Sequence, residues 1–322
     1  MRKWLAPAKV NRLAADPARQ TQAVDIGEID FSKPFLPEDY TQLYYTPLYR
    51  ALSDDQRLRY NQLFGIRTNE YIMMLEAELV ERLLRPLRRH PRVAGDAELV
   101  RAIDTMVEEE RRHYRYFVEL NRACLPEIFV EGRERYFSEL PWQARATFGL
   151  IGAIARQLAF PLWYLMAMEE ASMTLARDMI RTPETETLGP LEPTFLAVHR
   201  EHMKDEARHL QVDGLLIETC LMKDGGLRRR TNAKLFTSML GGITRPERSG
   251  SGVKVIRRLV RERPELQPRE EALIQAVLAL RDNAGYQKSL FNRRSMPLTF
   301  GLFDASPELD GLENAMVGYD RR

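Results

Sequence analysis

Apolar residues recur with the spacing of helices through most of the chain, from about residue 53 to residue 283. Ser53 and Gln56 form a capping-box pattern that predicts a helix start, and Leu58, Leu63 and Phe64 follow as its apolar positions. Further helices are predicted over residues 68–85, 96–124, 141–181 and 193–223, and shorter ones near 232–240, 252–262 and 268–283. Sustained alternation of polar and apolar residues, as in a strand, is missing. The pattern therefore predicts an all-α fold, a bundle of long helices with additional shorter ones.

The first 49 residues depart from this pattern. Five prolines interrupt them, so they predict an irregular N-terminal arm that packs on the bundle. We expect residues 50–305 to form one helical domain and residues 306–322 a C-terminal tail. Inside the domain, Pro161 is expected to bend the helix over residues 141–181, because proline removes one backbone hydrogen bond and clashes with the preceding turn.

The longest apolar stretch, residues 148–168, raises the question of a membrane span. It contains Arg156, Gln157 and Pro161 and ends on Glu169 and Glu170. A spanning helix would place Arg156 near the bilayer centre, at a cost of roughly 3 kcal/mol. We therefore expect a buried helix of a soluble bundle and no membrane span. Since no apolar segment follows the basic N-terminus and the chain has only two cysteines, we expect a cytoplasmic protein.

The overall composition is that of an ordinary globular protein, but the positions of the histidines are informative. Apolar residues make up 44% of the 322 residues and charged residues 29%, which is ordinary for a globular protein. The formal net charge is +2, from 48 basic and 46 acidic residues, so no nucleic-acid partner is expected. The five histidines are unevenly placed. His90 lies in a basic segment that predicts a solvated helix end, whereas His199, His202 and His209 all lie in one predicted helix.

That helix, over residues 193–223, carries a polar stripe on a face that should point into the core. His202, Glu206 and His209 are spaced i, i+4 and i+7 and so lie on one side of the helix. Apolar residues such as Phe195 share that side, and Asp213 extends the stripe by one turn. Burying imidazoles and a carboxylate is costly unless something compensates them, and a transition-metal ion is the simplest compensation.

Another predicted helix repeats part of this motif. The segment Glu109-Glu110-Arg111-Arg112-His113 has the same order of residue types as Asp205-Glu206-Ala207-Arg208-His209: an acid, Glu, any residue, Arg and His. Two Glu-x-x-His helices, together with one Glu from each of two other helices, form the ligand set of carboxylate-bridged di-iron and di-manganese bundles.

One further glutamate can be assigned to each of the two remaining long helices. Glu76 lies at an apolar position of the helix over residues 68–85, whereas Glu78 groups with charged residues on a solvated face. Glu169 lies at an apolar position of the helix over residues 141–181. Its neighbour Glu170 stays an alternative ligand, because a bend at Pro161 would rotate both residues relative to the bundle.

The complete pattern, Glu76, Glu110-x-x-His113, Glu169 and His202-x-x-x-Glu206-x-x-His209, resembles the p-aminobenzoate N-oxygenase (AurF-like) family of ferritin-like di-iron oxygenases. The resemblance covers about residues 35–305, and its distinguishing feature is the additional imidazole at His202. It implies that Glu110 and Glu206 are bridging carboxylates, that His113, His202 and His209 are imidazole ligands, and that Glu76 and Glu169 are terminal or bridging ligands. It also implies that Asp205 and Glu109 each accept the free ring N–H of the other repeat's histidine. By helical geometry, His199 lies one turn before His202 and is rotated from it, so we expect it to line a pocket or to lie beside the ligands.

The resemblance implies a function as well. Two iron ions, with manganese as the alternative, would use O2 as co-substrate to oxidise a small-molecule or carrier-bound amine to a hydroxylamine, nitroso or nitro product. A ferredoxin or reductase would supply electrons, and the chain is expected to form a homodimer. Two alternatives stay open at this point: a hydroxylase or desaturase acting on a C–H bond of a carrier-bound substrate, and a ferritin-like ferroxidase or iron-binding protein.

Aromatic and methionine residues near these glutamates and histidines indicate either a pocket or ordinary core packing. They are Tyr71, Met73, Met74, Trp163, Tyr164, Met166 and Met168. Their helical spacing is compatible with both interpretations.

Overall fold

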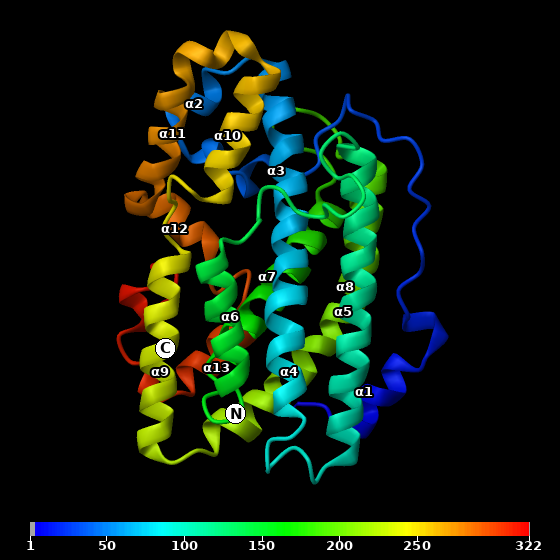
Figure 1. Cartoon of the computed structure of the whole chain (residues 1–322), viewed down its shortest axis with the longest axis vertical. Helices are drawn as coiled ribbons and strands as arrows, with labels where there is room; N and C mark the ends of the chain where they lie inside the picture. Colours follow the sequence, from blue (N-terminus) through cyan, green and yellow to red (C-terminus); the bar gives the residue numbers. More distant parts are fainter. Residues whose placement is uncertain (1–3, 322) are drawn as a thin grey trace.

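The computed structural model describes residues 4–321, and within this range the regular structure consists of helices and contains no β-strand, which confirms the predicted all-α fold (Figure 1). The α-helices are, in chain order, α1 (Pro7–Ala14), α2 (Pro47–Arg50), α3 (Asp54–Leu75), α4 (Glu81–Leu87), α5 (Ala97–Cys124), α6 (Trp142–Ile154), α7 (Pro161–Arg181), α8 (Pro193–Leu216), α9 (Gly226–Ile243), α10 (Ser251–Glu262), α11 (Glu270–Ala279), α12 (Ala284–Leu290) and α13 (Pro297–Asp304). Two π-helical turns, Glu76–Val80 and Ile217–Met222, continue α3 and α8.

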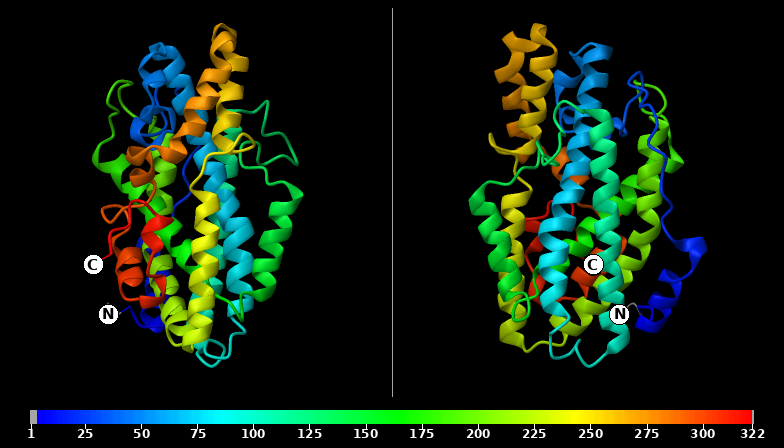
Figure 2. Two further views of the ribbon diagram at one scale, coloured as in Figure 1. Left: turned by 90° about the vertical axis from the view of Figure 1, so that its left-hand side faces the viewer. Right: turned by 45° about the vertical axis from the view of Figure 1, so that its right-hand side comes forward.

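The long helices lie side by side at the centre of the molecule, and the shorter ones surround them (Figures 1 and 2). Helix α7 packs along α8, α8 along α5, and α5 along α3. Around this centre, α6 packs on α4, α10 on α3, and both α9 and α13 on α7. The middle of each long helix is therefore enclosed by protein on several sides.

The apolar core is divided into two clusters, and each long helix passes from one to the other. Along α3, Ile72 and Met73 belong to one cluster, whereas Leu79 and Val80, in the π-helical turn after α3, belong to the other. On α5, α7 and α8 the same change occurs near the middle of the helix. The polar stripes predicted from the sequence lie at this boundary between the two clusters.

The helices predicted to start at Ser53 and to cover residues 68–85 are one continuous element. Ser53 and Gln56 make both contacts of the capping box, and α3 then continues through the π-helical turn Glu76–Val80 into α4. A π-helical turn inserts an extra residue into a helix and often occurs at functional sites. Glu76 is the first residue of this turn.

The prediction of one bent helix over residues 141–181 was wrong. Helix α6 ends at Ile154, and Pro161 is the first residue of α7. The N–H groups of a helix's first turn have no partner within the helix, so a proline at this position costs no hydrogen bond. The apolar stretch is thereby split, and α6 is largely exposed, with Trp142 and Leu150 facing outward, rather than buried. Within residues 4–321, no helix is both long enough and apolar enough to cross a membrane.

The N-terminal arm runs along the outside of α5 and α8, where it is drawn in dark blue (Figure 2). Its start is fixed by Trp4, whose indole lies so close to Gly214 of α8 that a Cβ atom there would come within 2.2 Å of it. Asn11 on α1 donates a hydrogen bond of 2.7 Å to the Glu98 carboxylate on α5. These contacts pack the arm against α5 and α8.

Candidate metal centre

Each of the four central segments contributes carboxylates or histidines at the boundary between the two apolar clusters. Glu76 begins the π-helical turn, α5 contributes Glu110 and His113, α7 contributes Glu169, and α8 contributes His202, Glu206 and His209. None of these seven residues is more than 7% exposed. The structure thus brings together the seven residues that the sequence analysis assigned to a metal site, and we call them the cluster.

The two histidines of the Glu-x-x-His repeats direct the same ring nitrogen at the carboxylates. Nδ1 of His113 lies 3.5 Å from an oxygen of Glu110 and 3.5 Å from one of Glu206. Nδ1 of His209 lies 3.1 Å from Glu110 and 3.6 Å from Glu169. The two repeats therefore meet around Glu110 and Glu206.

His202 adds a third imidazole on the side of His113. Its Nε2 lies 2.9 Å from Glu206 and 3.5 Å from Glu76, and its ring centroid is 4.5 Å from that of His113. Two groups have ligand atoms that all lie within 4.8 Å of one another, as holding a metal ion requires: Glu110, His113, Glu206 and His209, and Glu76, His113 and His202. His113 belongs to both groups.

The ligand atoms of the cluster face one another without aligned hydrogen bonds. Among the described residues, no hydrogen-bond partner is present for either carboxylate oxygen of Glu76 or Glu206, for Oε1 of Glu110, or for Nδ1 of His113 and His209. A buried polar atom without a partner costs about 1–3 kcal/mol. Carboxylate oxygens and imidazole nitrogens are donors that suit iron and manganese ions. The residues present therefore fit transition-metal ions, which would satisfy all these atoms at once.

Crossed hydrogen bonds hold the two repeat histidines in place. Nε2 of His113 lies 3.0 Å from Oδ2 of Asp205, and Nε2 of His209 lies 3.0 Å from Oε2 of Glu109. Each acid directly precedes the glutamate of the opposite repeat, so the expected crossed contacts are present. Because Nε2–H donates to a carboxylate in both rings, Nδ1 is the ring nitrogen left to bind a metal ion once it has lost its proton.

Arginines from both repeats join the two outer acids. Nη2 of Arg208 lies 2.6 Å from Oε1 of Glu109 and also contacts Oδ1 of Asp205. Nη2 of Arg112 lies 3.5 Å from Oδ2 of Asp205 and 3.7 Å from Oε1 of Glu109. No role was predicted for these arginines, although their shared position directly before each repeat histidine was a usable signal.

Burial and mutual charge shift the pKa values of the cluster in opposite directions. Burial raises the pKa of Glu76 to about 7 and that of Glu169 well above its ordinary value. For Glu110, burial is outweighed by the charge of His209 and by the close contacts with His113 and His209, which lower the pKa to about 2. Burial is likewise outweighed at His202, whose pKa is raised to about 10 by Glu206. The cluster therefore holds protons, and metal ions that bind there would displace them.

Glu170, the alternative ligand, is directed away from the cluster. Its two carboxylate oxygens accept hydrogen bonds of 2.8 Å from the backbone N–H groups of Leu298 and Thr299, in the first turn of α13. Glu169, by contrast, faces His209. On α7 the geometry thus favours Glu169 as the candidate ligand.

His199 and Asp213 extend the stripe of α8 beyond the cluster at its two ends. Nε2 of His199 lies 3.1 Å from Oδ1 of Asn69, and burial lowers the pKa of this histidine to about 3, so its ring is neutral. Asp213 is fully buried, and among the described residues neither of its carboxylate oxygens has a hydrogen-bond partner. Burial raises the pKa of Asp213 well above its ordinary value.

Two residues predicted to lie on the surface are buried. Glu78 forms ion pairs with Arg82 at 2.9 Å and with Arg135 at 3.1 Å. His90 is buried at a turn, where its Nδ1 accepts a hydrogen bond from the backbone N–H of Arg92. The charged neighbours of both residues had suggested exposure. Instead, two arginine side chains pair with the buried Glu78, and the backbone of Arg92 bonds to the buried His90.

A cavity of about 880 Å³ reaches the cluster from one side. Glu76, Glu110, Glu169, His202 and Glu206 line its inner end, so the cluster forms part of the cavity wall. Other residues that line it lie on α3, α6 and α7 and in the segments before α10 and after α12. An organic molecule bound in this cavity would therefore contact the cluster directly.

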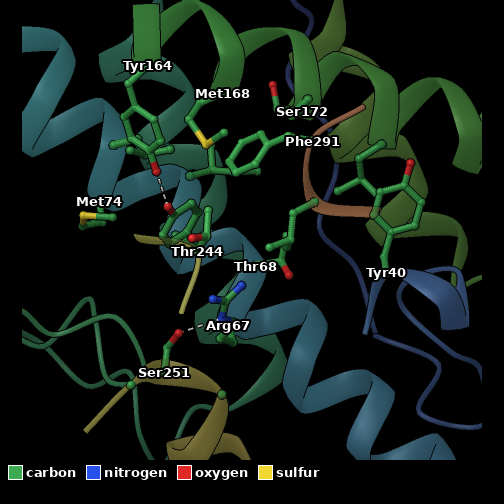
Figure 3. Close-up of a pocket in the computed structure, with 18 of the residues that line it drawn as sticks. Tyr40, Arg67, Thr68, Met74, Tyr164, Met168, Ser172, Thr244, Ser251 and Phe291 are labelled. Atoms are coloured by element: carbon green, nitrogen blue, oxygen red, sulfur yellow. Dashed lines mark hydrogen bonds between the residues drawn. The ribbon is translucent and has the colours of Figure 1, made fainter. Parts of the chain in front are cut away.

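The wall of the cavity combines apolar side chains with a few polar groups (Figure 3). Tyr71, Met74, Tyr164 and Met168 line the cavity, whereas Met73, Trp163 and Met166 belong to the core. The hydroxyl groups of Tyr71 and Tyr164 form a hydrogen bond, and Nε of Arg67 donates to Oγ of Ser251 at 2.8 Å. The aromatic and methionine residues singled out in the sequence are thus divided between pocket and core.

An all-α bundle whose central helices direct buried carboxylates and imidazoles at one another belongs to the class of helical bundles built to hold metal ions. The family model of P-aminobenzoate N-oxygenase AurF matches residues 20–277, a range that contains the whole cluster. The chain therefore belongs to this family of di-iron oxygenases with a ferritin-like helical fold. A search of curated proteins finds no match to the chain.

Proposed function

We propose that the protein is a non-haem di-iron N-oxygenase, which uses O2 to oxidise a substrate amine to a hydroxylamine, nitroso or nitro product. The proposed ligands are the residues of the cluster: Glu110 and Glu206 as bridging carboxylates, His113, His202 and His209 as imidazole ligands, and Glu76 and Glu169 as terminal or bridging ligands. The proposal is carried by one observation. In a chain of the N-oxygenase family, unpartnered ligand atoms converge at the inner end of a large cavity.

The residues around the cluster have definable tasks in this function. Two bound iron ions would supply the redox chemistry that activates O2. Asp205 and Glu109 keep the Nδ1 lone pairs of His113 and His209 directed inward, and the apolar clusters on both sides exclude water. The cavity would position the amine beside Glu76 and the other cluster residues that line its inner end.

The cavity also supports an organic substrate over a function in iron storage. A ferroxidase needs access only for metal ions and O2, whereas about 880 Å³ lies within the size range of organic-ligand sites, roughly 300–1,000 Å³. The third imidazole, His202, supports nitrogen oxidation over C–H hydroxylation or desaturation, since this residue distinguished the resemblance to the N-oxygenases. We extend the proposal to a cytoplasmic homodimer that receives electrons from a ferredoxin or reductase and acts on a small-molecule or carrier-bound amine.

Metal analysis combined with amine oxidation tests this function. Anaerobic titration of the metal-free protein with Fe(II) should saturate at two ions per chain. Exposure of the loaded, reduced protein to O2 with a panel of aromatic and aliphatic amines should give products that have gained oxygen on nitrogen, detected by mass spectrometry. The variant His202→Ala should lose this activity.

Each outcome has a distinct meaning. Saturation at one ion per chain would end the di-iron proposal. Rapid turnover of Fe(II) by O2 without any amine, and no oxidised amine, would favour the ferroxidase instead. A His202→Ala variant that keeps two iron ions and unchanged amine oxidation would remove His202 from the mechanism.

A further inference from the structure

The N-terminal arm touches the outer side of the cluster at one residue, Thr21. Its hydroxyl donates a hydrogen bond of 2.6 Å to Oδ2 of Asp205. The same oxygen lies 3.0 Å from Nε2 of His113. A residue outside the helical bundle is thus two hydrogen bonds away from the imidazole ring of His113, whose Nδ1 faces the cluster.

Neighbouring contacts hold this part of the arm on α8. The backbone N–H of Gln22 donates to the carboxylate of Glu201 at 2.8 Å, and Nη1 of Arg208 donates to the backbone carbonyl of Arg19 at 3.3 Å. The Thr21 hydroxyl also lies 3.3 Å from the backbone carbonyl oxygen of Glu201. Contacts on both sides of Thr21 therefore place its hydroxyl on Asp205.

The opposite repeat has no equivalent of this contact. The hydrogen bonds to the carboxylate of Glu109 come from His209 and Arg208, and among residues 4–321 no hydroxyl group donates to it. Asp205 receives hydrogen bonds from His113, from Arg208 and from the arm. The hydroxyl of Thr21 thus contacts only one of the two outer acids, Asp205, which holds His113.

We propose that Thr21 is a positioning residue for His113. Its hydroxyl fixes the carboxylate of Asp205 in the orientation that receives Nε2–H of His113, and this keeps Nδ1 directed at the cluster. Acids that bind a ligand histidine influence metal affinity by roughly 10- to 100-fold. Because Thr21 acts through such an acid, a smaller effect of roughly 3- to 10-fold is expected.

Order in the arm and metal binding are linked by this contact. If the arm raises the affinity for metal by some factor, bound metal must stabilise the docked arm by the same factor, since coupling between two sites is reciprocal. Arg19, two residues before Thr21, has a side chain that is 60% exposed and is a ready site for trypsin. Metal should therefore slow cleavage of the arm at Arg19.

Titration with Co(II) tests the positioning role, because the visible absorption of Co(II) reports its coordination and needs neither O2 nor an amine. The variants Thr21→Val and Thr21→Ala should weaken one of two Co(II) sites by roughly 3- to 10-fold and change its spectrum. Thr21→Ser, which keeps the hydroxyl, should have the Co(II) affinity and the spectrum of the wild-type protein. Gln22→Ala is the matched control, because Gln22 contacts α8 through its backbone and its side chain bonds only within the arm.

The outcomes separate this inference from the proposed function, on whose metal ligation it rests. A wild-type protein that binds no Co(II) would contradict the ligand assignment itself. A wild-type protein with two Co(II) sites, together with Thr21→Val and Thr21→Ala variants of unchanged affinity and spectrum, would overturn only the role of Thr21. Equal tryptic cleavage at Arg19 with and without Co(II) would overturn the link between arm and metal.

Discussion

The two five-residue repeats, residues 109–113 on α5 and 205–209 on α8, share the order acid-Glu-x-Arg-His but have different surroundings. The side chain of Arg208 is 7% exposed and contacts both outer acids closely. Its counterpart Arg112 is 38% exposed and comes no closer than 3.5 Å to either acid. The arm accounts for the difference, because it covers α8 at this height and accepts a hydrogen bond from Arg208.

The inner sides of the repeats differ as well. His113 has the imidazole of His202 and the carboxylate of Glu76 beside it, whereas His209 faces Glu169. We call these the His113 half and the His209 half of the cluster. The two repeats thus place equivalent candidate ligands, and the residues outside the repeats make the two halves unequal. Two metal ions bound there would have different ligand sets, as expected if they have different tasks.

Removal of the arginine that both halves share should have the largest effect. Arg208→Ala leaves Glu109 and Asp205, both almost fully buried, without their closest cation, so the free energy of unfolding should fall by about 3–5 kcal/mol. Arg112→Ala, the matched substitution in the other repeat, should cost at most about 1 kcal/mol, since this ion pair is longer and partly exposed. Urea denaturation of the metal-free variants measures both values, and equal losses would contradict the asymmetry described above.

Substitutions of the two outer acids should separate the halves by metal affinity. Asp205→Asn should weaken binding at the His113 half and Glu109→Gln at the His209 half, each by roughly 10- to 100-fold, because each histidine loses the carboxylate that orients it. Competitive Co(II) titrations with spectra of each site measure the effect.

A double-mutant comparison sharpens this result. Thr21→Val should have no further effect in the Asp205→Asn background if it acts through Asp205, but its full effect in the Glu109→Gln background. Identical spectral changes in Asp205→Asn and Glu109→Gln would instead mean that the two halves are not separate sites.

The long helices and the residues of the cluster could be predicted from the sequence because both follow the periodicity of an α-helix. His202, Glu206 and His209 share one face of a single helix, and the repeated acid-Glu-x-Arg-His order pairs α8 with α5 without knowledge of the fold. Such local patterns carry over directly because helical geometry is fixed. The crossed contacts of Asp205 and Glu109 were implied by the family resemblance, and the structure contains them.

Other features have no local record in the sequence. A proline such as Pro161 is compatible with a bend inside a helix and with the first turn of a new helix, and the local sequence does not distinguish between the two. In the structure Pro161 begins α7. The π-helical turn at Glu76 depends on one extra residue that apolar spacing does not reveal. The contact between Thr21 and Asp205 joins residues 184 positions apart in an irregular segment, so no periodicity predicts it.

The adjacent glutamates of α7 give the last and smallest test of the comparison, because only one of them faces the His209 half. Glu169→Gln should weaken metal binding at that half while leaving the fold intact, since burial already raises the pKa of this carboxyl and disfavours its charge.

Glu170→Gln removes a carboxylate that accepts two backbone N–H groups at the start of α13, so it should cost about 0.5–2 kcal/mol of stability, as loss of a helix cap does. It should leave the metal stoichiometry unchanged. Denaturation curves and metal titrations of both variants decide the point, and the reverse pattern would mean that Glu170, not Glu169, serves the His209 half.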